Sequence, residues 1–240
     1  MNDDILISVF TLNVSEFIKN LFLDLKKNEL INYHIICLNN NSEDDTLQVI
    51  NNLKVEMNIK NLEIISHTKN MGYGFNKKVT FDYAIKNNFK KIVFLHGDNQ
   101  YPASGVNEML GLLDSNSLVF GSRFLNKKSV QENMPRIKFL INPFFTKIIN
   151  LLSGSSFSEY FSGFRGYRVD DLKKINYKNL SNDFVLDQQM MFEIMKMNLK
   201  ITEFEIPTVY GNQVSKVQPI MYTLSLFKNI FFYFILRKWF

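Results

Sequence analysis

The chain has 240 residues, of which 46% are hydrophobic and 14% aromatic, so it can bury a sizeable core and is not disordered as a whole. Its one cysteine, Cys37, excludes an intramolecular disulfide and a multi-cysteine zinc site, and we expect a reducing compartment. The net charge of +5 is not gathered in a dense basic cluster. This argues against a nucleic-acid partner and fits an anionic substrate or membrane surface. Residues 1–4 are acidic and no long apolar run follows them, so no secretory signal is expected.

The first half of the chain alternates short apolar runs with segments of helical spacing. Residues 17–25 and a segment from about Glu43 onward have the spacing of helices. We expect strands at residues 5–10, 34–38, 62–66, 91–95 and 118–121. Strands that alternate with helices form βαβ units, so the predicted fold class is α/β, with a mainly parallel, Rossmann-like central sheet flanked by helices.

Polar or glycine-rich residues follow every one of these strands. In a parallel sheet, ligands bind beyond the carboxyl ends of the strands. The segments expected to carry a site are therefore residues 11–13, 39–45, 67–74, 96–100 and 122–123.

The second half of the chain is more apolar. Residues 136–152 predict a helix interrupted by Pro143, residues 184–197 a helix, and residues 201–206 a strand. Within the final segment, 222–240, the apolar run 230–236 is too short to cross a membrane, which takes roughly 20 apolar residues, and Lys228 and Asn229 interrupt the longer run from Tyr222. The segment ends in a basic and aromatic group typical of an interfacial anchor. The alternative for both apolar segments is a place in the core or in a contact between two copies of the chain.

The fourth predicted strand ends in His96-Gly97-Asp98-Asn99-Gln100, before a helix expected to start near Pro102. A carboxylate at the carboxyl end of a strand is well placed to hold a divalent cation, and that cation can bind a diphosphate. Asp98 is thus a candidate metal ligand, and the competing interpretation is that it only caps a turn.

This segment belongs to a series of short motifs along the chain. They are Phe10-Thr11-Leu12-Asn13, Asn39–Thr46, Asn70-Met71-Gly72-Tyr73-Gly74, His96–Gln100, Gly121-Ser122-Arg123 and Ser162-Gly163-Phe164-Arg165. In this order and spacing they resemble the motifs of family 2 glycosyltransferases of GT-A fold. The branch they resemble is that of dolichol-phosphate mannose synthase and the bacterial polyprenyl-phosphate glycosyltransferases. The resemblance runs from Ile5 to about Lys216.

The resemblance implies a domain organisation and a set of site residues. It implies a GT-A domain over residues 1–216, with a nucleotide-sugar half at about 1–123 and an acceptor half at about 124–216. An apolar C-terminal helix at 217–240, able to anchor at a membrane interface, follows. The residues implied to bind the nucleotide-sugar donor are Thr11, Asn13, Asn39, Asn40, Asn70, Gly72, Tyr73, Gly74, Gly97, Arg123 and Lys216. Those implied to be catalytic are Asp187, Asp98 and Arg165, and those implied to hold Mg²⁺ or Mn²⁺ are Asp98, Gln100 and His96.

Several positions depart from the family pattern. Asn39 and Asn40 stand where the family has two aspartates that help to hold the nucleoside, and an asparagine forms hydrogen bonds without a charge. His96 replaces the first aspartate of the metal motif. Mg²⁺ prefers oxygen ligands whereas Mn²⁺ tolerates imidazole, so we expect weaker metal binding or a site completed by the phosphates of the nucleotide. A ribose contact or a supporting role behind the metal ligands is equally open for His96. Gln189 stands where the branch carries a glutamate.

Some residues admit two interpretations from the sequence. Lys77 and Lys78 either face a phosphate or are solvated residues of a helix, which is the commoner case, and Lys216 has the same two alternatives. Gly72 and Gly74 lack the third glycine of a dinucleotide-binding fingerprint, so we interpret them as letting the backbone approach the donor.

The expected reaction is one in-line displacement that inverts the anomeric centre, with a nucleoside diphosphate as leaving group. A hydroxyl acceptor needs a base, for which Asp187 is the candidate, whereas a phosphate acceptor is already ionised. Asp183 is expected to cap the helix that contains Asp187. The expected partners are a nucleotide-sugar donor and a lipid-linked or surface-glycan acceptor. The protein is expected to be peripheral at the cytoplasmic face of the membrane, and a homo-oligomer is compatible with the sequence.

Two other functions remain open from the sequence. A degenerate family member would bind a nucleotide or a protein partner without turnover, as the departures at Asn39, Asn40 and His96 suggest. A nucleotidyltransferase with a similar sheet would carry a glycine-rich basic loop after the first strand, which residues 10–13 lack.

Overall fold

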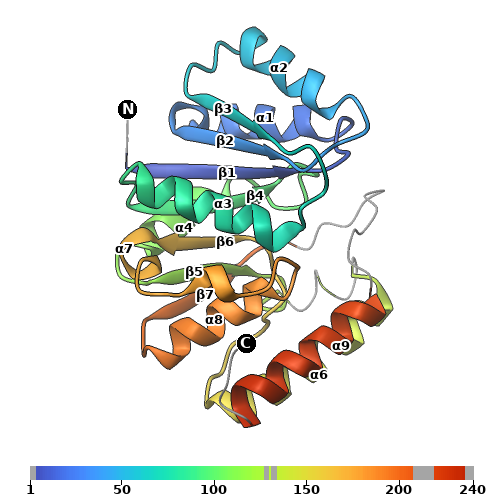
Figure 1. Cartoon of the computed structure of the whole chain (residues 1–240), viewed down its shortest axis with the longest axis vertical. Helices are drawn as coiled ribbons and strands as arrows, with labels where there is room; N and C mark the ends of the chain where they lie inside the picture. The colour runs from blue at the N-terminus through green and yellow to red at the C-terminus, as the bar shows by residue number, and fades with distance from the viewer. Residues whose placement is uncertain (1–3, 127–129, 131–133, 208–218, 236–240) are drawn as a thin grey trace.

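A computed structural model describes residues 4–126, 130, 134–207 and 219–235, and forms an α/β fold with helices on both faces of one sheet (Figure 1). The strands are β1 (Ile5–Thr11), β2 (His34–Asn39), β3 (Leu62–Ser66), β4 (Lys91–His96), β5 (Leu118–Ser122), β6 (Arg165–Arg168) and β7 (Ile201–Glu205). The α-helices are α1 (Ile18–Lys27), α2 (Thr46–Glu56), α3 (Tyr73–Lys86), α4 (Gly105–Leu112), α6 (Arg136–Ser153), α7 (Val169–Leu172), α8 (Leu186–Lys196) and α9 (Pro219–Ile230). The bounds of every predicted strand are confirmed to within one residue.

The strands form a seven-stranded sheet in the order β3-β2-β1-β4-β6-β5-β7. The pairs are parallel except for those of β6, which lies antiparallel between β4 and β5. The mainly parallel sheet is therefore confirmed. The sequence does not predict β6, because this short strand is half arginine and has no apolar run, although Arg165 and Tyr167 are buried in it.

Alternate residues of β1 face two separate cores. Ile5, Ile7 and Val9 belong to a core with α1, α2 and α4, whereas Leu6 belongs to a core with α3, α6, α8 and α9. Both faces of the sheet are thus covered, as a mainly parallel sheet requires.

Two helices start later than the sequence predicts. Helix α2 begins at Thr46 and not near Glu43, because the Asp44 carboxylate accepts a hydrogen bond from the backbone N–H of Thr46 (3.0 Å) and fixes the preceding loop. Helix α8 begins at Leu186, and the prediction that Asp183 caps it is wrong. The Leu186 N–H donates to the Asp183 carbonyl (3.1 Å) in a turn, which moves the N-cap position to Val185.

Pro143 lies inside α6, which runs for 18 residues through it, so the predicted interruption is wrong. A proline removes one intrahelical hydrogen bond. The helix continues because its inner side is held in the core by Phe145 and Ile149.

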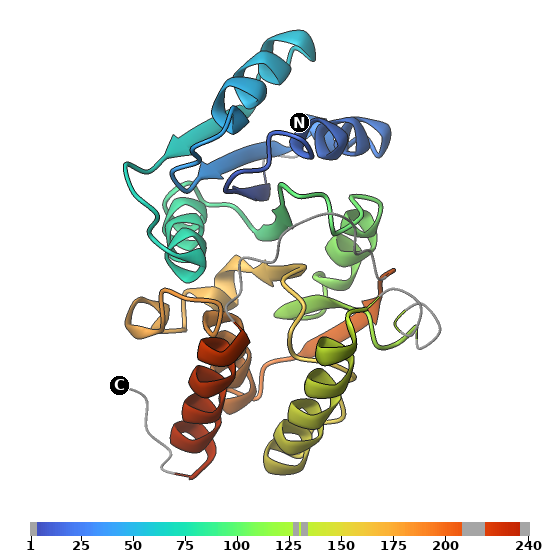
Figure 2. The ribbon, with the colours of Figure 1, turned by 90° about the vertical axis from the view of Figure 1, so that its right-hand side faces the viewer.

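Helices α6 and α9 lie side by side at the end of the molecule remote from α2 (Figures 1 and 2). The ring centroids of Phe145 and Phe227 are 4.7 Å apart and join the two helices. Helix α9 continues as a π-helical turn, Phe231–Ile235. No helix within the described ranges is long and apolar enough to span a bilayer.

Candidate functional site

The loops that follow β1, β2 and β4 meet at the carboxyl edge of the sheet. The backbone N–H of Asn40 donates to the carbonyl of Thr11 (2.9 Å), which joins the loops after β1 and β2. The N–H of Gly97 donates to the carbonyl of Phe10 (2.8 Å), which joins the loop after β4 to the same place. Motifs that are far apart in the sequence therefore form one continuous part of the surface.

Amide side chains hold the Asn-x-Gly-x-Gly loop in this position. Asn40 Nδ2 donates to Asn70 Oδ1 (2.8 Å), and Asn40 Oδ1 accepts a hydrogen bond from the backbone N–H of Met71 (2.8 Å). Asn70 Oδ1 also accepts one from the N–H of Gly72 (3.0 Å). A neutral amide suits this role because it offers a donor and an acceptor together. Contact of Asn40 and Asn70 with a nucleoside stays a prediction.

The other polar residues predicted to bind the donor also have partners within the protein. Thr11 is buried and its hydroxyl donates to a backbone carbonyl of β2 (3.2 Å). Asn39 Oδ1 accepts a hydrogen bond from the N–H of Ser42 (3.2 Å), and Asn13 Oδ1 accepts one from the N–H of Glu43 (2.8 Å). These contacts order the edge of the sheet and leave a role in donor binding as a prediction.

The glycines at the start of α3 let another part of the chain approach. A Cβ at Gly74 would lie 2.7 Å from the backbone carbon of Asn182, and one at Gly72 would lie 2.6 Å from the Asn182 carbonyl oxygen. Gly72 also has a φ of +93°, which favours glycine. The space that we expected to admit the donor therefore admits the loop before α8. At Gly97, a Cβ would lie 2.9 Å from Thr11 Cγ2, so this glycine packs β4 against β1.

A buried carboxylate lies where α3, β6 and α8 meet. Asp187 is 5% exposed and forms an ion pair with Lys77 Nζ. Its Oδ2 accepts a hydrogen bond from Tyr73 Oη (2.9 Å) and lies 3.9 Å from Arg165 Nε. One carboxylate thus contacts a phenol and two cations from distant parts of the sequence. We call Tyr73, Lys77, Arg165 and Asp187 the Asp187 cluster.

Lys77 is the member of the cluster that the sequence did not identify. The interpretation of Lys77 as a solvated lysine is wrong, because its side chain is fully buried, and a phosphate contact stays a prediction. Burial lowers the pKa of Lys77 to about 8, although the Asp187 carboxylate opposes this change. The sequence could have indicated this position, since Lys77 follows Tyr73 by four residues and residues four apart share a helix face. The neighbouring Lys78 donates to carbonyl groups and to Asn182 Oδ1 (2.9 Å) in the loop before α8.

Arg165 holds the backbone around the Asp187 carboxylate. It is fully buried and donates to the carbonyl oxygens of Ser162 (2.9 Å), Tyr160 (2.7 Å) and Asp187 (2.7 Å). These bonds fasten the Ser162–Arg165 motif to the first turn of α8. Arg165 is therefore a positioning residue for Asp187, and its contact with a leaving group stays a prediction.

The end of β4 carries the candidate metal ligands. Asp98 Oδ1 accepts a hydrogen bond from the backbone N–H of Gln100 (3.1 Å). The His96 ring contacts those of Tyr73 and Tyr101, with centroids 5.6 and 5.0 Å away, and its Nε2 is a buried atom without a hydrogen-bond partner in the described structure. Burial lowers the pKa of His96 against the pull of Asp98, which favours the neutral imidazole that binds metals.

Gly163 explains how His96 fits against the Ser162–Arg165 motif. A Cβ at Gly163 would lie 2.9 Å from His96 Nε2. An imidazole nitrogen and a carboxylate are both ligands that Mn²⁺ accepts, so a metal shared by His96 and Asp98 stays a prediction. Among the residues that the structure describes, no group of three or more His, Cys, Asp or Glu side chains could hold a metal.

Arg123 is fixed at the end of β5 by a buried glutamate. Its Nη2 and Nε donate to Glu159 Oε2 (2.7 Å) and Oε1 (3.1 Å), and its backbone N–H donates to Oε1 (2.7 Å). Lys216, predicted to bind the donor, lies outside the described residues.

Gln189 connects α8 to its neighbours. Its Oε1 accepts a hydrogen bond from the N–H of Ser181 (2.7 Å), and its Nε2 donates to Asn229 Oδ1 of α9 (2.7 Å). The Gln189 amide therefore donates one hydrogen bond and accepts another, which an ionised glutamate at this position could not do.

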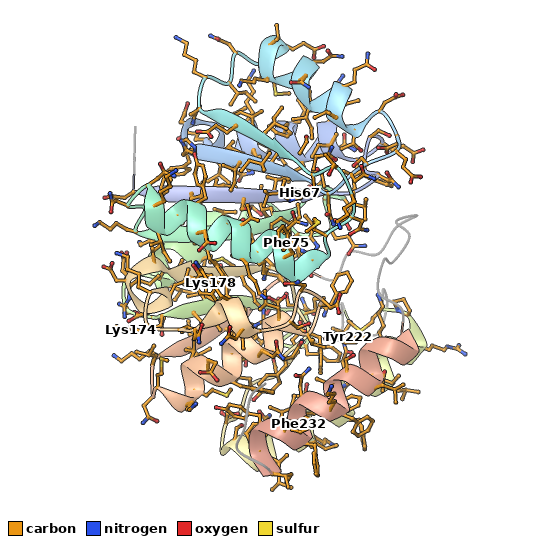
Figure 3. All side chains as sticks on the ribbon, viewed as in Figure 1. His67, Phe75, Lys174, Lys178, Tyr222 and Phe232 are labelled. Atoms are coloured by element: carbon orange, nitrogen blue, oxygen red, sulfur yellow. The ribbon has the colours of Figure 1, made fainter. Side chains whose placement is uncertain are left out.

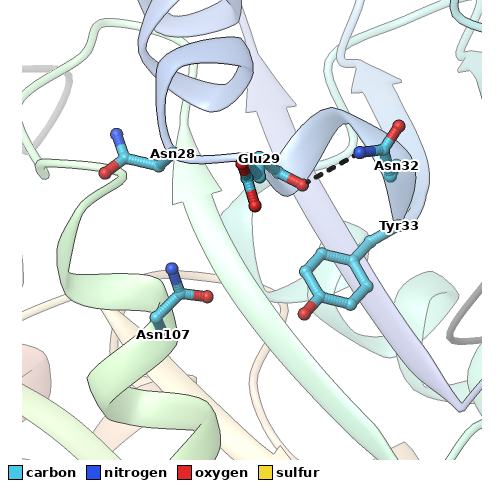
Figure 4. A pocket seen from close by; sticks show the side chains of 5 residues that line it. All are labelled: Asn28, Glu29, Asn32, Tyr33 and Asn107. Carbon is cyan, nitrogen blue, oxygen red and sulfur yellow. Dashed lines mark hydrogen bonds between the residues drawn. The ribbon is translucent and has the colours of Figure 1, made fainter.

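Two pockets lie outside the carboxyl edge. One of about 250 Å³ is lined by residues that precede β2 and by Asn107 of α4 (Figure 4). The other, of about 260 Å³, lies between the start of α8 and α9 with its π-helical turn; Tyr222 of α9 and Phe232 of that turn are labelled in Figure 3. Phe232 lines this second pocket, and no residue of the Asp187 cluster lines either of them.

The sequence of this chain matches a family described as Glycosyl transferase family 2, over residues 6–176. The chain belongs to this family. It is therefore a glycosyltransferase, and the resemblance that its motifs suggested is confirmed at the level of the family. The narrower branch of dolichol-phosphate mannose synthase stays a prediction.

Similar proteins support the fold. The uncharacterized protein MJ1222 of Methanocaldococcus jannaschii is 24% identical over 87% of this chain and 82% of its own length. Glucosyl-3-phosphoglycerate synthase of Mycobacterium tuberculosis, solved with UDP, has a TM-score of 0.64 at 13% identity, covering 91% of this chain and 75% of that one. The mannosyltransferase PcManGT of Pyrobaculum calidifontis, solved with GDP-Man and Mn²⁺, has a TM-score of 0.61 at 11% identity, covering 87% and 58%. TarS residues 1–349 of S. aureus, solved with UDP-GlcNAc, has a TM-score of 0.60 at 15% identity, covering 95% and 65%.

The chain spans less than two thirds of the PcManGT and TarS chains. These likenesses establish the GT-A fold, with its α/β architecture and mainly parallel sheet.

Proposed function

We propose that this glycosyltransferase moves a sugar from a nucleoside diphosphate sugar to a lipid-linked or surface-glycan acceptor, with inversion at the anomeric carbon. The observation that carries the proposal is the Asp187 cluster, which joins the Asn-x-Gly-x-Gly loop, the Ser162–Arg165 motif and α8 around one buried carboxylate. Solved neighbours in complex with UDP, UDP-GlcNAc or GDP-Man support a nucleoside diphosphate donor.

The charge balance of the cluster favours an acceptor that arrives ionised. Asp187 contacts the ammonium of Lys77 and lies 3.9 Å from the guanidinium of Arg165. The two cations outnumber the single carboxylate, so the cluster has a net positive charge that attracts an anion. A hydroxyl acceptor needs a base to remove its proton, whereas a phosphate acceptor needs none. We therefore favour a lipid-linked phosphate, and Asp187 then orients the acceptor through Tyr73 and Lys77.

Asp98 and His96 are the residues that would hold Mn²⁺ or Mg²⁺. When bound, such an ion neutralises negative charge on the diphosphate leaving group. The unsatisfied His96 Nε2 and the use of Mn²⁺ in the complex of PcManGT favour Mn²⁺. Arg123, held by Glu159, would add positive charge at the end of β5. An acceptor of this class fits a peripheral location at the cytoplasmic face of a membrane.

A thermal-shift panel tests the donor. UDP, GDP and their sugar conjugates are each added with Mn²⁺, Mg²⁺ or a chelator. A ligand of the folded state at ~100 times its Kd stabilises it by about 2.7 kcal/mol. A metal-dependent response to one nucleotide supports the proposal. Absence of any response from folded protein would instead favour a degenerate member that binds a protein partner without turnover.

The acceptor is tested by product analysis with a polyprenyl phosphate and with a hydroxyl-terminated glycan, using Asp187→Asn and the exposed neighbour Asp183→Asn as its control. If the acceptor is a phosphate, Asp187→Asn keeps the ionised nucleophile and loses mainly acceptor affinity, seen as a raised KM. If the acceptor is a hydroxyl, loss of the base lowers kcat by about 100- to 10,000-fold. That second result, with Asp183→Asn fully active, would refute the phosphate assignment. The anomeric configuration of the product tests inversion.

A further inference from the structure

Most of the large apolar side chains that the described structure exposes lie on α6 and on α9 with its π-helical turn. Leu151 is 85% exposed and Leu140 67% exposed on α6, and Leu224 is 59% exposed on α9. Monomeric proteins rarely expose apolar patches of this kind without a binding partner. We define the apolar face as Leu140, Phe144 and Leu151 of α6 with Leu224, Phe227 and Phe231 of α9 and its π-helical turn.

Each helix presents its exposed apolar residues as a stripe at helical spacing. On α6 the stripe is Leu140, Phe144 and Leu151, and the opposite side holds the buried Phe145 and Ile149. On α9 the stripe is formed by residues 224, 227 and 231, with the buried Leu226, Asn229 and Ile230 turned toward the protein. Each helix is thus apolar on both its inner and its outer side, so its outer side is not an ordinary solvated face.

The two stripes are connected by aromatic contacts between α6 and α9. The Phe144 ring contacts that of Phe145, with centroids 5.5 Å apart, and the Phe145 ring contacts that of Phe227 at 4.7 Å. Figure 2 shows α6 and α9 next to each other at the same end of the molecule. The exposed apolar residues of both helices therefore lie at the same end of the molecule, joined through the buried Phe145 ring.

The charges on this part of the chain have a single sign. Residues 134–158 and 206–240 contain no aspartate or glutamate. Helix α6 carries Arg136, Lys138 and Lys147, and α9 carries Lys228. Lys147 and Lys228 are exposed beside the apolar residues. An apolar stripe flanked only by basic residues is the pattern of helices that lie in the interface of an anionic bilayer.

We propose that the apolar face of α6 and α9 docks onto the surface of an anionic lipid bilayer, with both helices lying in the interface plane. A second copy of the chain is disfavoured as the occupant, because a symmetric contact through this face would bring lysines together with no acidic partner. The proposal names the surface on which a lipid-linked acceptor would be met, and in that respect it rests on the proposed function. The docking itself requires neither donor nor acceptor.

Vesicle sedimentation of the whole chain tests the docking without substrates. We expect the protein to bind vesicles of phosphatidylcholine with 30% phosphatidylglycerol, and to bind pure phosphatidylcholine much more weakly. Lys147→Gln with Lys228→Gln should weaken binding about thirtyfold, since each basic residue near such a surface contributes about a fivefold factor. The control is Lys26→Gln with Lys60→Gln, exposed lysines at α1 and beyond α2, which should bind as the unchanged protein does.

A second set of variants tests the apolar contribution. Leu140→Ser, Leu151→Ser and Leu224→Ser together should reduce binding to anionic vesicles at least about tenfold, because each removes apolar area that would enter the bilayer. The matched control replaces the exposed Leu23 and Val55 of α1 and α2 with serine. Circular dichroism verifies that all variants are folded.

The possible results distinguish a bilayer from a second copy of the chain as the partner of the apolar face. They also distinguish the docking proposal from the proposed function. Equal sedimentation with and without anionic lipid, or equal binding by face and control variants, would overturn the proposal. So would a dimer in analytical ultracentrifugation that the apolar-face variants abolish, found without vesicle binding. Loss of docking with transfer intact on a detergent-dispersed acceptor would leave the proposed function standing. Docking without any transfer would refute the function alone.

Discussion

Replacing Lys77 with methionine is the sharpest perturbation of the Asp187 cluster. Lys77 is fully buried and Asp187 is 5% exposed. Removing the Lys77 ammonium therefore leaves a buried carboxylate without its ion-pair partner. Breaking a buried ion pair from one side costs about 3–5 kcal/mol. Because Tyr73 at 2.9 Å and Arg165 at 3.9 Å still contact Asp187, we expect the lower end, about 3 kcal/mol. The aliphatic part of methionine fills most of the vacated space.

Urea unfolding followed by far-UV circular dichroism measures this loss. The control is Lys78→Met, which changes the adjacent lysine, whose ammonium contacts the loop before α8 at its edge. It should cost about 1–2 kcal/mol, because water can replace the hydrogen bonds that Lys78 makes at the protein surface. The double variant Lys77→Met with Asp187→Leu removes both charges and should be more stable than Lys77→Met alone.

The lowered pKa of Lys77 adds a pH dependence with a definite sign. Its pKa is about 8 in the folded chain and 10.5 in the unfolded chain. Between these values the unfolded chain binds more protons, so the contribution of Lys77 to stability rises with pH. The stability that Lys77→Met loses should therefore be larger at pH 9.5 than at pH 7, by about 2 kcal/mol. Subtracting the variant from the unchanged protein cancels the titration of Cys37 and the tyrosines. A loss that shrinks over this range, or a loss at pH 7 no greater than that of Lys78→Met, would refute the reasoning.

Two further predictions concern the loops of the site. Asp98→Asn should abolish the additional thermal stabilisation that Mn²⁺ gives in the presence of the preferred nucleotide, and keep the melting temperature without ligand; an unchanged metal response would remove the metal assignment. Gly74→Ala should lower the melting temperature by several degrees, because its Cβ would lie 2.7 Å from the backbone of Asn182. Gly111→Ala in α4, whose Cβ would have nothing within 4 Å, should keep or raise it, and equal effects at both glycines would contradict the packing argument.

The sheet could be predicted because its strands are continuous apolar runs between polar loops. Residues 91–95 illustrate this, since both faces of β4 are covered and four of its residues are buried. The strand β6 could not be predicted, because its sequence Arg-Gly-Tyr-Arg has no continuous apolar run. It pairs antiparallel between β4 and β5 through the buried side chains of Arg165 and Tyr167, which depends on partners far away in the chain.

The site could be predicted in part. The polar segments after β1, β2 and β4 meet as the geometry of a parallel sheet requires, so their joint position follows from strand order alone. The partners of each side chain do not follow from it. Gly72 and Gly74 have a backbone preference that the sequence reveals, but what enters the space beside them is the loop at Asn182, over a hundred residues later. From the sequence, Lys77 resembles a solvated helix lysine, because nothing near it in the chain indicates its ion pair with Asp187.

The Asp187 cluster has a consequence for how variants of this enzyme are interpreted. Tyr73 and Lys77 come from α3, Arg165 from the antiparallel strand β6, and Asp187 from α8, so the same contacts that shape the site also fasten its two sides together. A loss of activity in any of these four residues therefore does not identify a catalytic group. A role in the reaction changes kcat in a protein of unchanged stability, whereas a positioning role changes acceptor affinity together with the free energy of unfolding. Arg165 donates to backbone carbonyl groups, whereas Tyr73 donates to the Asp187 carboxylate itself. We therefore expect variants of Arg165 to lose mainly stability and variants of Tyr73 to change mainly acceptor affinity.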